Sequence, residues 1–497
     1  MNDRTAQNPA LIRLLVIGCG LLLGIFLAHL IAIDTFPPFI DELIHVHGSE
    51  QAYGESLLTN ANLGRQFTIW WMMLFQAHQG SPIWVGRVAM LLAVLPGVAA
   101  LMGSGQRAAG KWGMVLAGLF YLFSNYHFFF GRLALADPIA GSAVLVAIYF
   151  SYRLSRRIHW HDAILTALFL FLAIGAKIST LPYLGIPIAA ALTLRSNGRS
   201  WRAQLRWAVI ASLTAIVLVI GYVGGMRLFK QDVFSNSVSY ALTRHGRAAA
   251  TSLFDVGRIL RNVQFSLDIL TGYLGATVVI LSLAAMLILV LQRRFYVVLC
   301  ALAPLAIIWI NQIQESRFLF VPAALLLFCG ASVLGDMLRR QARAIQTLGM
   351  GLALAWGLLG WLPFIITAAR DPVQLPLPNA DFDQYVRSDA SGFGLAEVRQ
   401  IVRSRQPTLV IGLLSNCQAL RYLSLSDFPV ECPTLRPSGA NIDALTALME
   451  TRRAPGVYVV LEQLPFVPVG APGSKIAEVE RPGGGPTLSI YELSPDA

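Results

Sequence analysis

Charged residues are scarce in this sequence. Only 13% of its 497 residues are Asp, Glu, Lys or Arg, and only 27 are acidic. Soluble chains carry about 25% charged residues, and disordered chains combine high charge with few apolar residues. Here the hydrophobic fraction is 56% and the mean hydropathy is +0.61. A soluble core stops growing at about 250–300 residues and cannot bury this excess. The scarcity of charge therefore excludes a disordered chain and a soluble single-core protein, and leaves a polytopic membrane protein.

Cysteine is rare, and we find no internal repeat. The sequence holds five cysteines, and Cys19, Cys300 and Cys329 lie in apolar runs, where cysteine acts as a small apolar residue. Cys417 and Cys432 lie in a polar C-terminal region, where they form either a disulfide or two free thiols. The lack of a repeat is evidence against an inverted-repeat transporter.

Apolar runs predict about eleven membrane-spanning helices. A spanning helix needs about 20 mostly apolar residues, because the bilayer offers its backbone no hydrogen-bond partner. The first run, 11–33, is longer than the core of a cleavable signal peptide, so we expect it to be retained. The further runs lie near residues 81–102, 112–129, 138–152, 162–176, 178–194, 207–226, 272–291, 295–310, 318–335 and 345–368.

The formal net charge of +11 invites a nucleic-acid function, but the positions of the basic residues explain it otherwise. Cytoplasmic connections between spans are enriched in Lys and Arg. With a cytoplasmic N-terminus, every second short connection of this chain is basic. These connections hold Arg107, Lys111, Arg153, Arg156, Arg157, Arg195, Arg199, Arg202, Arg206, Arg293, Arg294, Arg339, Arg340 and Arg343. The charge therefore predicts a cytoplasmic N-terminus and an extracytoplasmic C-terminus, and it requires no nucleic acid.

Two of the predicted outside connections, 34–80 and 227–271, are too long to be simple links. In the first, the aromatic run 67–75 is too short to span a membrane and is typical of a helix at the membrane interface. In the second, apolar residues recur at helical spacing over 253–263. We therefore expect both segments to add structure outside the membrane.

The composition changes after residue 368. The following residues contain Pro and Gly clusters, a helical stretch near 394–404, and strand-like runs at 408–414, 457–461 and 487–491. Alternating strands and helices are typical of an α/β domain. We therefore predict an all-α transmembrane domain, 1–368, and a small extracytoplasmic α/β domain, 369–497.

Two acidic sites stand at predicted outer ends of spans, where ionisable residues are rare and often functional. Asp41 and Glu42 follow the first span, and Asp137 precedes Pro138 at the start of the fourth. On a helix, Asp41 shares a face with His45, whereas Glu42 points elsewhere. Two simpler interpretations stay open at this point. Asp137 is also a candidate helix cap, and Asp41 a candidate solvated loop acid.

Four basic residues lie at the same outer ends, against the general bias of the charge: Arg65, Arg132, Lys177 and Arg317. Lys177 ends an apolar run, so its charge predicts an anionic partner or ligand, unless the side chain reaches up to the lipid headgroups. Cations beside isolated carboxylates suit a reaction between a lipid phosphate leaving group and an acceptor hydroxyl. The cations stabilise charge on the phosphate oxygen, and a carboxylate takes the proton.

Metal ligands of suitable type are present near the first acidic site, namely Asp41, His45, His47, Glu50 and Glu55. The two histidines, however, point to different faces of a helix, and no further cluster has the spacing of a zinc site. A divalent metal is therefore not indicated, and we assign no cofactor.

Together these motifs resemble the polyprenyl-phosphate-dependent membrane glycosyltransferases of the C-type fold, in particular the bacterial branch related to protein O-mannosyltransferases and lipid A aminoarabinose transferases. The resemblance rests on Asp41-Glu42, on the segment Arg132 to Asp137, on Lys177, and on Glu315-Ser-Arg317-Phe. The segment 391–398 also looks like one that follows the last helix in some bacterial members. The resemblance covers the whole chain in order and spacing, and it implies a location in the bacterial inner membrane.

The resemblance implies a role for each matched residue. Asp41 would be the catalytic base, and Asp137 would be the acid of the second outside loop, a catalytic residue that helps form the acceptor or sugar site. Lys177 and Arg317 would contact the lipid phosphate. Further substrate-binding residues would be Glu42, His45, Arg65, Arg132 and Glu315. His45 and Phe318 each stand where the family usually has Tyr, a departure that bears on sugar or phosphate recognition.

We therefore predict a glycosyltransferase that moves a sugar from a polyprenyl-phosphate donor to a hydroxyl of a protein, lipid or glycan acceptor. Transfer would take place on the extracytoplasmic side by a single inverting displacement. A lipid-linked sugar flippase or other secondary transporter is the alternative, although a transporter places its ionisable groups near the bilayer midplane. A membrane-anchored sensor that works through residues 369–497 is a third interpretation.

Overall fold

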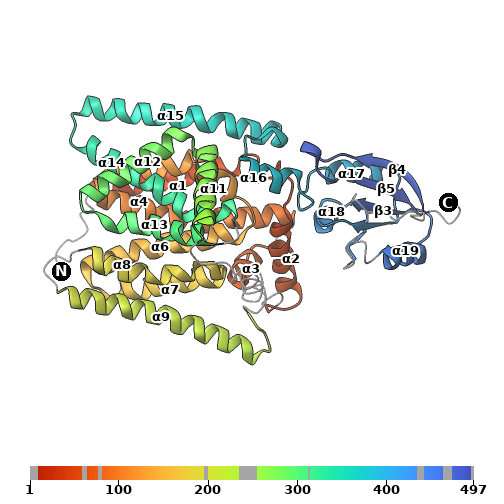
Figure 1. Cartoon of the computed structure of the whole chain (residues 1–497), viewed down its shortest axis with the longest axis horizontal. Helices are drawn as coiled ribbons and strands as arrows, with labels where there is room; N and C mark the ends of the chain where they lie inside the picture. The colour runs from red at the N-terminus through yellow and green to blue at the C-terminus, as the bar shows by residue number, and fades with distance from the viewer. Residues whose placement is uncertain are drawn as a thin grey trace.

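The structure, a computed structural model, describes residues 9–58, 64–76, 81–194, 200–233, 255–311, 314–433, 442–462 and 473–493. Helices form a bundle along the long axis of the molecule, and a region with a sheet lies beyond one end of it (Figure 1). Parts of both long outside connections, 59–63, 77–80 and 234–254, lie outside the described residues.

Six helices in the described part of the chain are long and apolar enough to cross a membrane. They are α1 (Pro9–Leu30), α4 (Pro82–Leu122), α6 (Ala136–Arg157), α9 (Trp201–Leu228), α14 (Phe320–Arg339) and α15 (Arg343–Arg370). A further candidate is the pair α11 (Val256–Leu274) and α12 (Ala276–Leu291), which is bent by 115°. Shorter apolar helices are α7 (Trp160–Ala176), α8 (Ile186–Thr193) with the preceding η2 (Ile178–Gly185), and α13 (Phe295–Ile310). These helices support the multi-pass membrane class, and the number of eleven spans stays a prediction.

Helix α4 covers the predicted span near 81–102 and the first part of the span near 112–129, and it reverses direction between them. Its backbone is not helical at Ala109 and Gly110, and Gly110 has a φ of +68°. In a straight helix, residues eight positions apart lie about 12 Å from each other along the axis. Here a Cβ placed on Gly105 would collide with the carbonyl oxygen of Gly113. Glycines therefore let the two halves of α4 approach backbone to backbone.

The short helices α2 (Ile40–Gly54) and α3 (Gln66–Met73) lie at the end of the bundle that faces the sheet (Figure 1). Helix α3 is the aromatic segment predicted from the sequence. The Phe67 ring packs against the Phe171 ring of α7 at 5.0 Å, and Trp71 Nε1 donates to the Ala89 carbonyl of α4 at 2.7 Å. These contacts fasten α3 to the bundle.

The C-terminal region contains a five-stranded sheet with the order β2-β1-β3-β5-β4. Strand β1 is parallel to its neighbours β2 and β3, whereas β5 is antiparallel to the central strand β3 and to β4. The strands are β1 (Leu409–Leu413), β2 (Val430–Glu431), β3 (Val457–Glu462), β4 (Ser474–Val479) and β5 (Leu488–Glu492), and the helices are α17 (Leu395–Arg403), α18 (Cys417–Leu423), α19 (Ile442–Thr451) and η7 (Pro482–Gly484). The predicted alternation is confirmed by α17, β1, β3 and β5. Sequence reasoning missed β2, which has two residues, and β4, which is largely exposed and lacks a buried apolar run.

Cys417 and Cys432 form a disulfide, which decides between the two alternatives left open by the sequence. The neighbouring Asn416 connects the sheet region to the bundle, because its Nδ2 donates to the Pro38 carbonyl at 3.0 Å and to the Ala390 carbonyl at 2.9 Å. Pro38 directly precedes α2. The α/β region therefore touches the start of the helix that carries Asp41.

A segment after α15 returns to the bundle before the sheet begins. It contains η4 (Pro372–Gln374), α16 (Asn379–Phe382) and η5 (Asp383–Arg387). The buried ring of Tyr385 packs against Phe39 at 4.5 Å and against Phe129 of α5 (Asn125–Phe130) at 5.3 Å. This aromatic cluster joins the start of α2, α5 and the returning segment.

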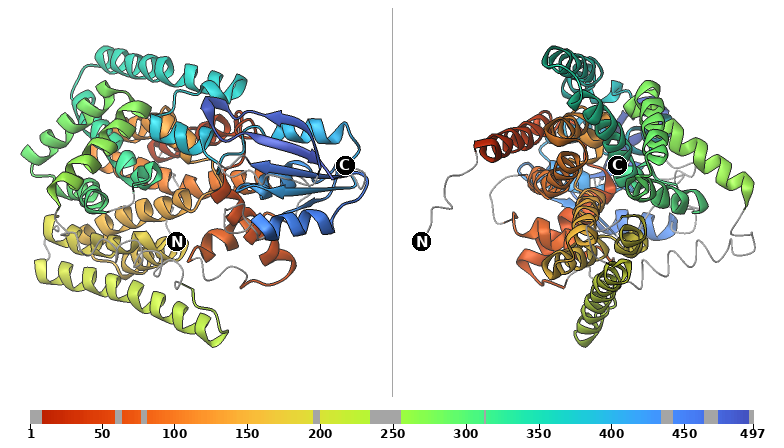
Figure 2. Two further views of the ribbon diagram at one scale, coloured as in Figure 1. Left: turned by 45° about the vertical axis from the view of Figure 1, so that its right-hand side comes forward. Right: turned by 90° about the vertical axis from the view of Figure 1, so that its left-hand side faces the viewer.

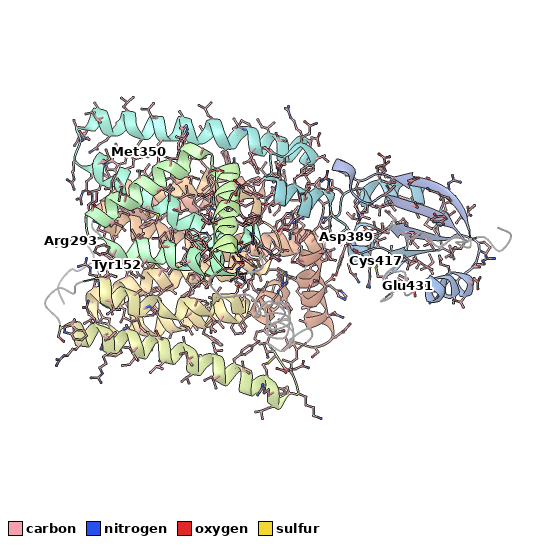
Figure 3. All side chains as sticks on the ribbon, in the orientation of Figure 1. Tyr152, Arg293, Met350, Asp389, Cys417 and Glu431 are labelled. Atoms are coloured by element: carbon pink, nitrogen blue, oxygen red, sulfur yellow. A yellow bond between two sulfur atoms is a disulfide. The ribbon has the colours of Figure 1, made fainter. Side chains whose placement is uncertain are left out.

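One predicted cytoplasmic connection and the sheet region lie at opposite ends of the bundle. Arg293, in a predicted cytoplasmic connection, lies at the end farthest from the sheet, whereas Asp389 and Cys417 lie at the other end (Figure 3). Seen along the bundle axis, the sheet lies behind the helices (Figure 2, right). The opposite orientation of the two termini across a membrane stays a prediction.

Candidate active site

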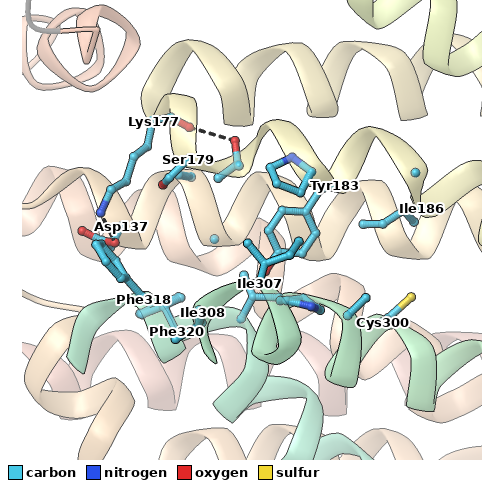
Figure 4. Close-up of a pocket in the computed structure, with 18 of the residues that line it drawn as sticks. Asp137, Lys177, Ser179, Tyr183, Ile186, Cys300, Ile307, Ile308, Phe318 and Phe320 are labelled. Carbon is cyan, nitrogen blue, oxygen red and sulfur yellow. Dashed lines mark hydrogen bonds and ion pairs between the residues drawn. The ribbon is translucent and has the colours of Figure 1, made fainter. Parts of the chain in front are cut away.

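Five of the residues singled out in the sequence form one continuous cluster of charges. Arg317 is at its centre, in η3 (Ser316–Leu319), a short turn before α14. Its Nη1 lies 2.7 Å from Asp41 Oδ2, and its Nε lies 2.5 Å from Glu315 Oε2 and 3.8 Å from Asp137 Oδ2. Asp137 Oδ1 in turn accepts from Lys177 Nζ at 2.6 Å (Figure 4). The cluster thus holds three carboxylates and two cations, drawn from four separate segments.

Local structure explains why these side chains meet. Asp41 lies in the first turn of α2 and Asp137 in the first turn of α6, where the helix dipole favours a carboxylate. Lys177 follows the last residue of α7, and its extended backbone turns the chain away from the helix. All three charges therefore lie at helix ends and not within a long apolar helix.

The two simpler interpretations of the acids do not describe their contacts. The residue that caps α6 is Leu135, and the Asp137 carboxylate is directed to Lys177 instead. Asp41 is paired with Arg317 and its side chain is only 22% exposed, so it is not a free loop acid. Burial by itself raises the pKa of Asp41, but Arg317 and Arg65 together hold it below its usual value. Asp41 is therefore ionised at neutral pH.

The cluster opens on an elongated cavity of about 300 Å³. Asp137, Lys177 and Arg317 line its charged end, and the ring of Phe318 packs under the Lys177 ammonium at 4.6 Å. Apolar residues from η2, α8, α13 and α14 line the remainder, among them Tyr183, Ile186, Ala189, Cys300, Pro304, Ile307 and Val321 (Figure 4). A charged end followed by apolar walls suits an amphipathic ligand with an anionic head.

His45 and Arg65 form a second layer beside Asp41. His45 Nε2 lies 3.1 Å from Arg65 Nη1, and its Nδ1 lies 2.9 Å from the Ala134 carbonyl oxygen, which accepts a hydrogen bond. Burial and the neighbouring Arg65 charge lower the pKa of His45 to about 3, so the imidazole is neutral and donates through Nδ1. The Arg65 guanidinium can then donate to Nε2. Both side chains lie near Asp41 but do not line the cavity.

Glu42 is directed away from the cluster, as its position on α2 predicts. Its two oxygens accept from Arg87 Nε at 2.9 Å and Arg87 Nη2 at 2.8 Å. They also accept from the backbone N–H groups of Ala134 at 2.8 Å and Phe39 at 3.0 Å. Both side chains of the Glu42–Arg87 pair are almost completely buried. The pair ties the start of α2 to α4 and to the loop before α6.

Arg132 is likewise engaged away from the cavity. Its Nη1 donates to the carbonyls of Ile31 at 2.9 Å and Ala32 at 3.0 Å, and its guanidinium lies 4.2 Å from the centre of the Phe128 ring. Ala32 has a left-handed φ of +57°, at the turn that follows α1. Arg132 thus closes the end of the first helix.

Sequence reasoning missed Arg87 and a set of aromatic and acidic residues under the cluster. Arg87 was counted as part of the apolar run near 81–102, although an arginine inside such a run is itself a signal of a buried partner. Asp381 and Tyr273 are hydrogen-bonded to each other at 2.7 Å and lie 108 positions apart in the sequence. No local pattern joins them.

No cluster of three or more His, Cys, Asp or Glu side chains that could hold a metal ion is found among the residues that the structure describes. His45 is instead hydrogen-bonded to Arg65 and to the Ala134 carbonyl.

The apolar helices, the charged site at the sheet side of the bundle and the terminal α/β region together define a class of polytopic membrane protein. No protein-family model matches the sequence, and no curated protein is similar to it. The structure of ArnT from Cupriavidus metallidurans in the apo state is similar over 97% of this chain and 98% of that one, with 14% identity and a TM-score of 0.59. The same ArnT bound to undecaprenyl phosphate matches with 13% identity and a TM-score of 0.56 over the same shares. An oligosaccharyltransferase from Archaeoglobus fulgidus has a TM-score of 0.48 at 12% identity, covering 90% of this chain and 69% of that one. The predicted C-type glycosyltransferase fold is confirmed.

Proposed function

We propose that this chain is a membrane glycosyltransferase that moves a sugar from a polyprenyl-phosphate carrier to an acceptor hydroxyl on the extracytoplasmic side. The observation that carries the proposal is the junction of the cation pair Lys177 and Arg317 with an apolar-walled cavity, beside the ionised Asp41. That ArnT, which shares the fold, was solved with undecaprenyl phosphate bound supports a lipid of this class as the ligand.

The lipid phosphate lies at the charged end of the cavity in this proposal. The guanidinium of Arg317 and the ammonium of Lys177 are the donors for its oxygens, and charge-assisted hydrogen bonds of this type are the strongest available. The apolar residues of η2, α8 and α13 take up the first part of the polyprenyl chain. The bilayer is as apolar as these walls, so the chain adds little hydrophobic free energy and serves to place the phosphate at the charged end.

Asp41 is the proposed base. Its oxygen accepts the proton of the acceptor hydroxyl while that hydroxyl oxygen attacks the anomeric carbon. The bond between the anomeric carbon and the phosphate oxygen breaks, and its electron pair stays on the phosphate, where Lys177 and Arg317 stabilise the charge. One displacement of this kind inverts the configuration at the anomeric carbon.

The Arg317–Asp41 pair has a consequence for the order of events. While Arg317 holds Asp41, the low pKa makes this carboxylate a weak base. A donor phosphate that takes over the Arg317 guanidinium weakens the pair, and the pKa of Asp41 rises toward its usual value. Asp137 keeps Lys177 in place during this exchange, since it is its direct partner.

The remaining predicted binding residues divide into two groups. His45, Arg65 and Glu315 lie beside Asp41 or Arg317, where an acceptor or sugar is expected. Glu42 and Arg132 hold backbone segments around the site, and we assign them to positioning the loops.

A transporter or flippase is the alternative function. Transporters place their ionisable groups at broken helices near the bilayer midplane. In this chain Asp137 lies at the start of α6, Lys177 directly after α7 and Arg317 in the turn before α14. These positions at helix ends favour the transferase.

The test is sugar transfer by the full-length protein with Asp41→Asn and Asp137→Asn, using a polyprenyl-phosphate-linked sugar as donor. We expect a loss of at least about 100-fold for Asp41→Asn, because general-base catalysis contributes about 10²–10⁴-fold. Asp268→Asn, on an exposed position of α11, is the matched control and should leave the rate unchanged. Full activity in both site variants would refute the mechanism, and lipid-linked sugar crossing the bilayer without transfer would favour the flippase.

A further inference from the structure

The segment after α15 packs directly against the bundle below the charge cluster. Pro378, one residue before α16, lies against Gly272 of α11, where an added Cβ would come within 2.8 Å of the proline ring. Tyr385, a few residues later, lies in the aromatic cluster with Phe39 and Phe129. The segment is therefore held in place from both sides of α16.

Asp381 of α16 is buried in this contact with no cation bonded to it. Its side chain is fully buried, and one carboxylate oxygen accepts from the Tyr273 hydroxyl at 2.7 Å. The other oxygen, Oδ1, has no hydrogen-bond partner among the described residues. A carboxylate in this position is costly, since burial of an acid without a bonded cation disfavours its charged form. Burial indeed raises the pKa of Asp381 to about 6, against the opposing effects of Ser316, Tyr273 and Arg317.

The neighbours of Asp381 lead to Arg317. Ser316 directly precedes Arg317, and its carbonyl accepts from the Tyr126 hydroxyl at 2.6 Å. The rings of Tyr126 and Tyr273 meet edge to face at 5.5 Å. Ser316 and the Arg317 charge both act on Asp381, so its carboxylate lies close to the turn that carries the guanidinium. Asp381, Tyr273 and Tyr126 thus form a chain of contacts that ends at the backbone of η3.

We infer that Asp381 is a positioning residue for Arg317: through Tyr273 and Ser316 it fixes the η3 turn so that the guanidinium faces the head of a lipid phosphate. The inference rests on the proposed function for the identity of that ligand. It gives the segment between α15 and the sheet a role in substrate binding, although none of its residues lines the cavity.

The experiment measures binding of undecaprenyl phosphate to the full-length protein in detergent. Asp381→Ala removes the acceptor for Tyr273, and we expect its Kd to rise about tenfold, in line with loss of one buried hydrogen-bonding position. Asp381→Asn keeps an oxygen that can accept from Tyr273, and its Kd should stay within about threefold of wild type. Asp383→Asn is the matched control, because Asp383 lies two residues away in an exposed pair with Arg387.

A double-mutant cycle with Arg317→Lys separates positioning from general damage. If Asp381 acts through Arg317, the tenfold effect of Asp381→Ala should shrink to about twofold in the Arg317→Lys background, since coupled residues are not additive. In transfer assays the donor KM should rise while the acceptor KM stays constant. An equal effect in both backgrounds, or an unchanged Kd in a folded Asp381→Ala protein, would overturn the inference.

If Asp381→Ala does not fold, Tyr273→Phe carries the test, because it removes the donor and leaves the packing. Weaker binding of undecaprenyl phosphate by Tyr273→Phe supports the inference, and unchanged binding overturns it. A wild-type protein that does not bind the lipid would instead refute the proposed function, so the two failures are distinguishable.

Discussion

The buried Glu42–Arg87 pair gives a prediction whose size follows from the contacts. Arg87→Ala leaves the Glu42 carboxylate completely buried with only the backbone N–H groups of Phe39 and Ala134 as partners. It also removes the two hydrogen bonds that Arg87 Nη1 donates to the carbonyls of Ile33 and Phe36, at 2.7 and 2.8 Å. Removing one member of a buried ion pair costs about 3–5 kcal/mol. We therefore expect Arg87→Ala to lose about 4 kcal/mol of unfolding free energy, in the middle of that range.

The double variant Glu42→Gln with Arg87→Met should be far milder. Replacing both members of a buried pair by uncharged groups of similar volume is often nearly neutral, and the Gln oxygen can still accept from the two N–H groups. We expect a loss of about 1–2 kcal/mol, for the lost carbonyl contacts. Each single variant should thus be less stable than the double variant.

The assay is denaturant unfolding of the detergent-solubilised protein. Arg340→Ala is the control, because the Arg340 side chain is 67% exposed in its pair with Asp336, and exposed pairs contribute about 0–1 kcal/mol. The reasoning would be refuted if the losses of unfolding free energy in Glu42→Gln and Arg87→Met simply added up to the loss in the double variant. So would an Arg87→Ala protein within about 1 kcal/mol of wild type, a loss too small for a broken buried pair.

Three further predictions follow from the site and the sheet region. Lys177→Gln should raise the donor KM about 10–100-fold in steady-state transfer assays, since a charge-assisted hydrogen bond contributes about 1.5–3 kcal/mol; an unchanged KM would remove Lys177 from phosphate binding. Reduction of Cys417–Cys432, or Cys417→Ala with Cys432→Ala, should lower stability by about 3 kcal/mol as the closed loop of 15 residues is lost, measured by denaturant unfolding with and without reductant. The pKa of Asp381 is raised to about 6 in the folded protein, so above pH 6 its ionised carboxylate lowers the free energy of unfolding. This cost is lost as the pH falls from 6 toward 3.8, the usual pKa of an aspartate. The stability of wild type relative to Asp381→Asn should therefore rise as the pH is lowered from 7 to 4, and a constant difference would contradict the assignment.

Scarcity of charge made much of the cluster predictable from the sequence. In a chain with long apolar runs, Asp137, Lys177 and Arg317 stand out one by one, and each predicts a partner because an isolated charge is costly there. The same reasoning separated Asp41 from Glu42, since neighbours on a helix face different directions. What the sequence could not supply is which charges meet. Lys177 and Asp137 are 40 positions apart, and the cap alternative for Asp137 was equally consistent with local pattern.

The fold shows a similar limit. The spans near 81–102 and 112–129 were predicted because Arg107 and Lys111 interrupt the apolar run, and the glycines of α4 place the reversal there. The sequence placed an outside segment with helical spacing before the span near 272–291, but the angle of 115° between α11 and α12 depends on tertiary packing and was not predicted. Asp381 was missed because it lies in a polar stretch, where an acidic residue is usually exposed to solvent. Only tertiary packing buries it.

The balance of charge in the cluster bears on selectivity. Asp41, Asp137 and Glu315 already satisfy Arg317 and Lys177, so an arriving anion finds no vacant cation and has to displace an internal carboxylate. A free phosphate or a water-soluble sugar phosphate has only its charge for this competition. A polyprenyl phosphate is held in the bilayer by its chain, which raises the effective concentration of its head at the cluster. The internal ion pairs therefore select against soluble anions. The lipid chain gives a polyprenyl phosphate the advantage it needs to displace the carboxylate.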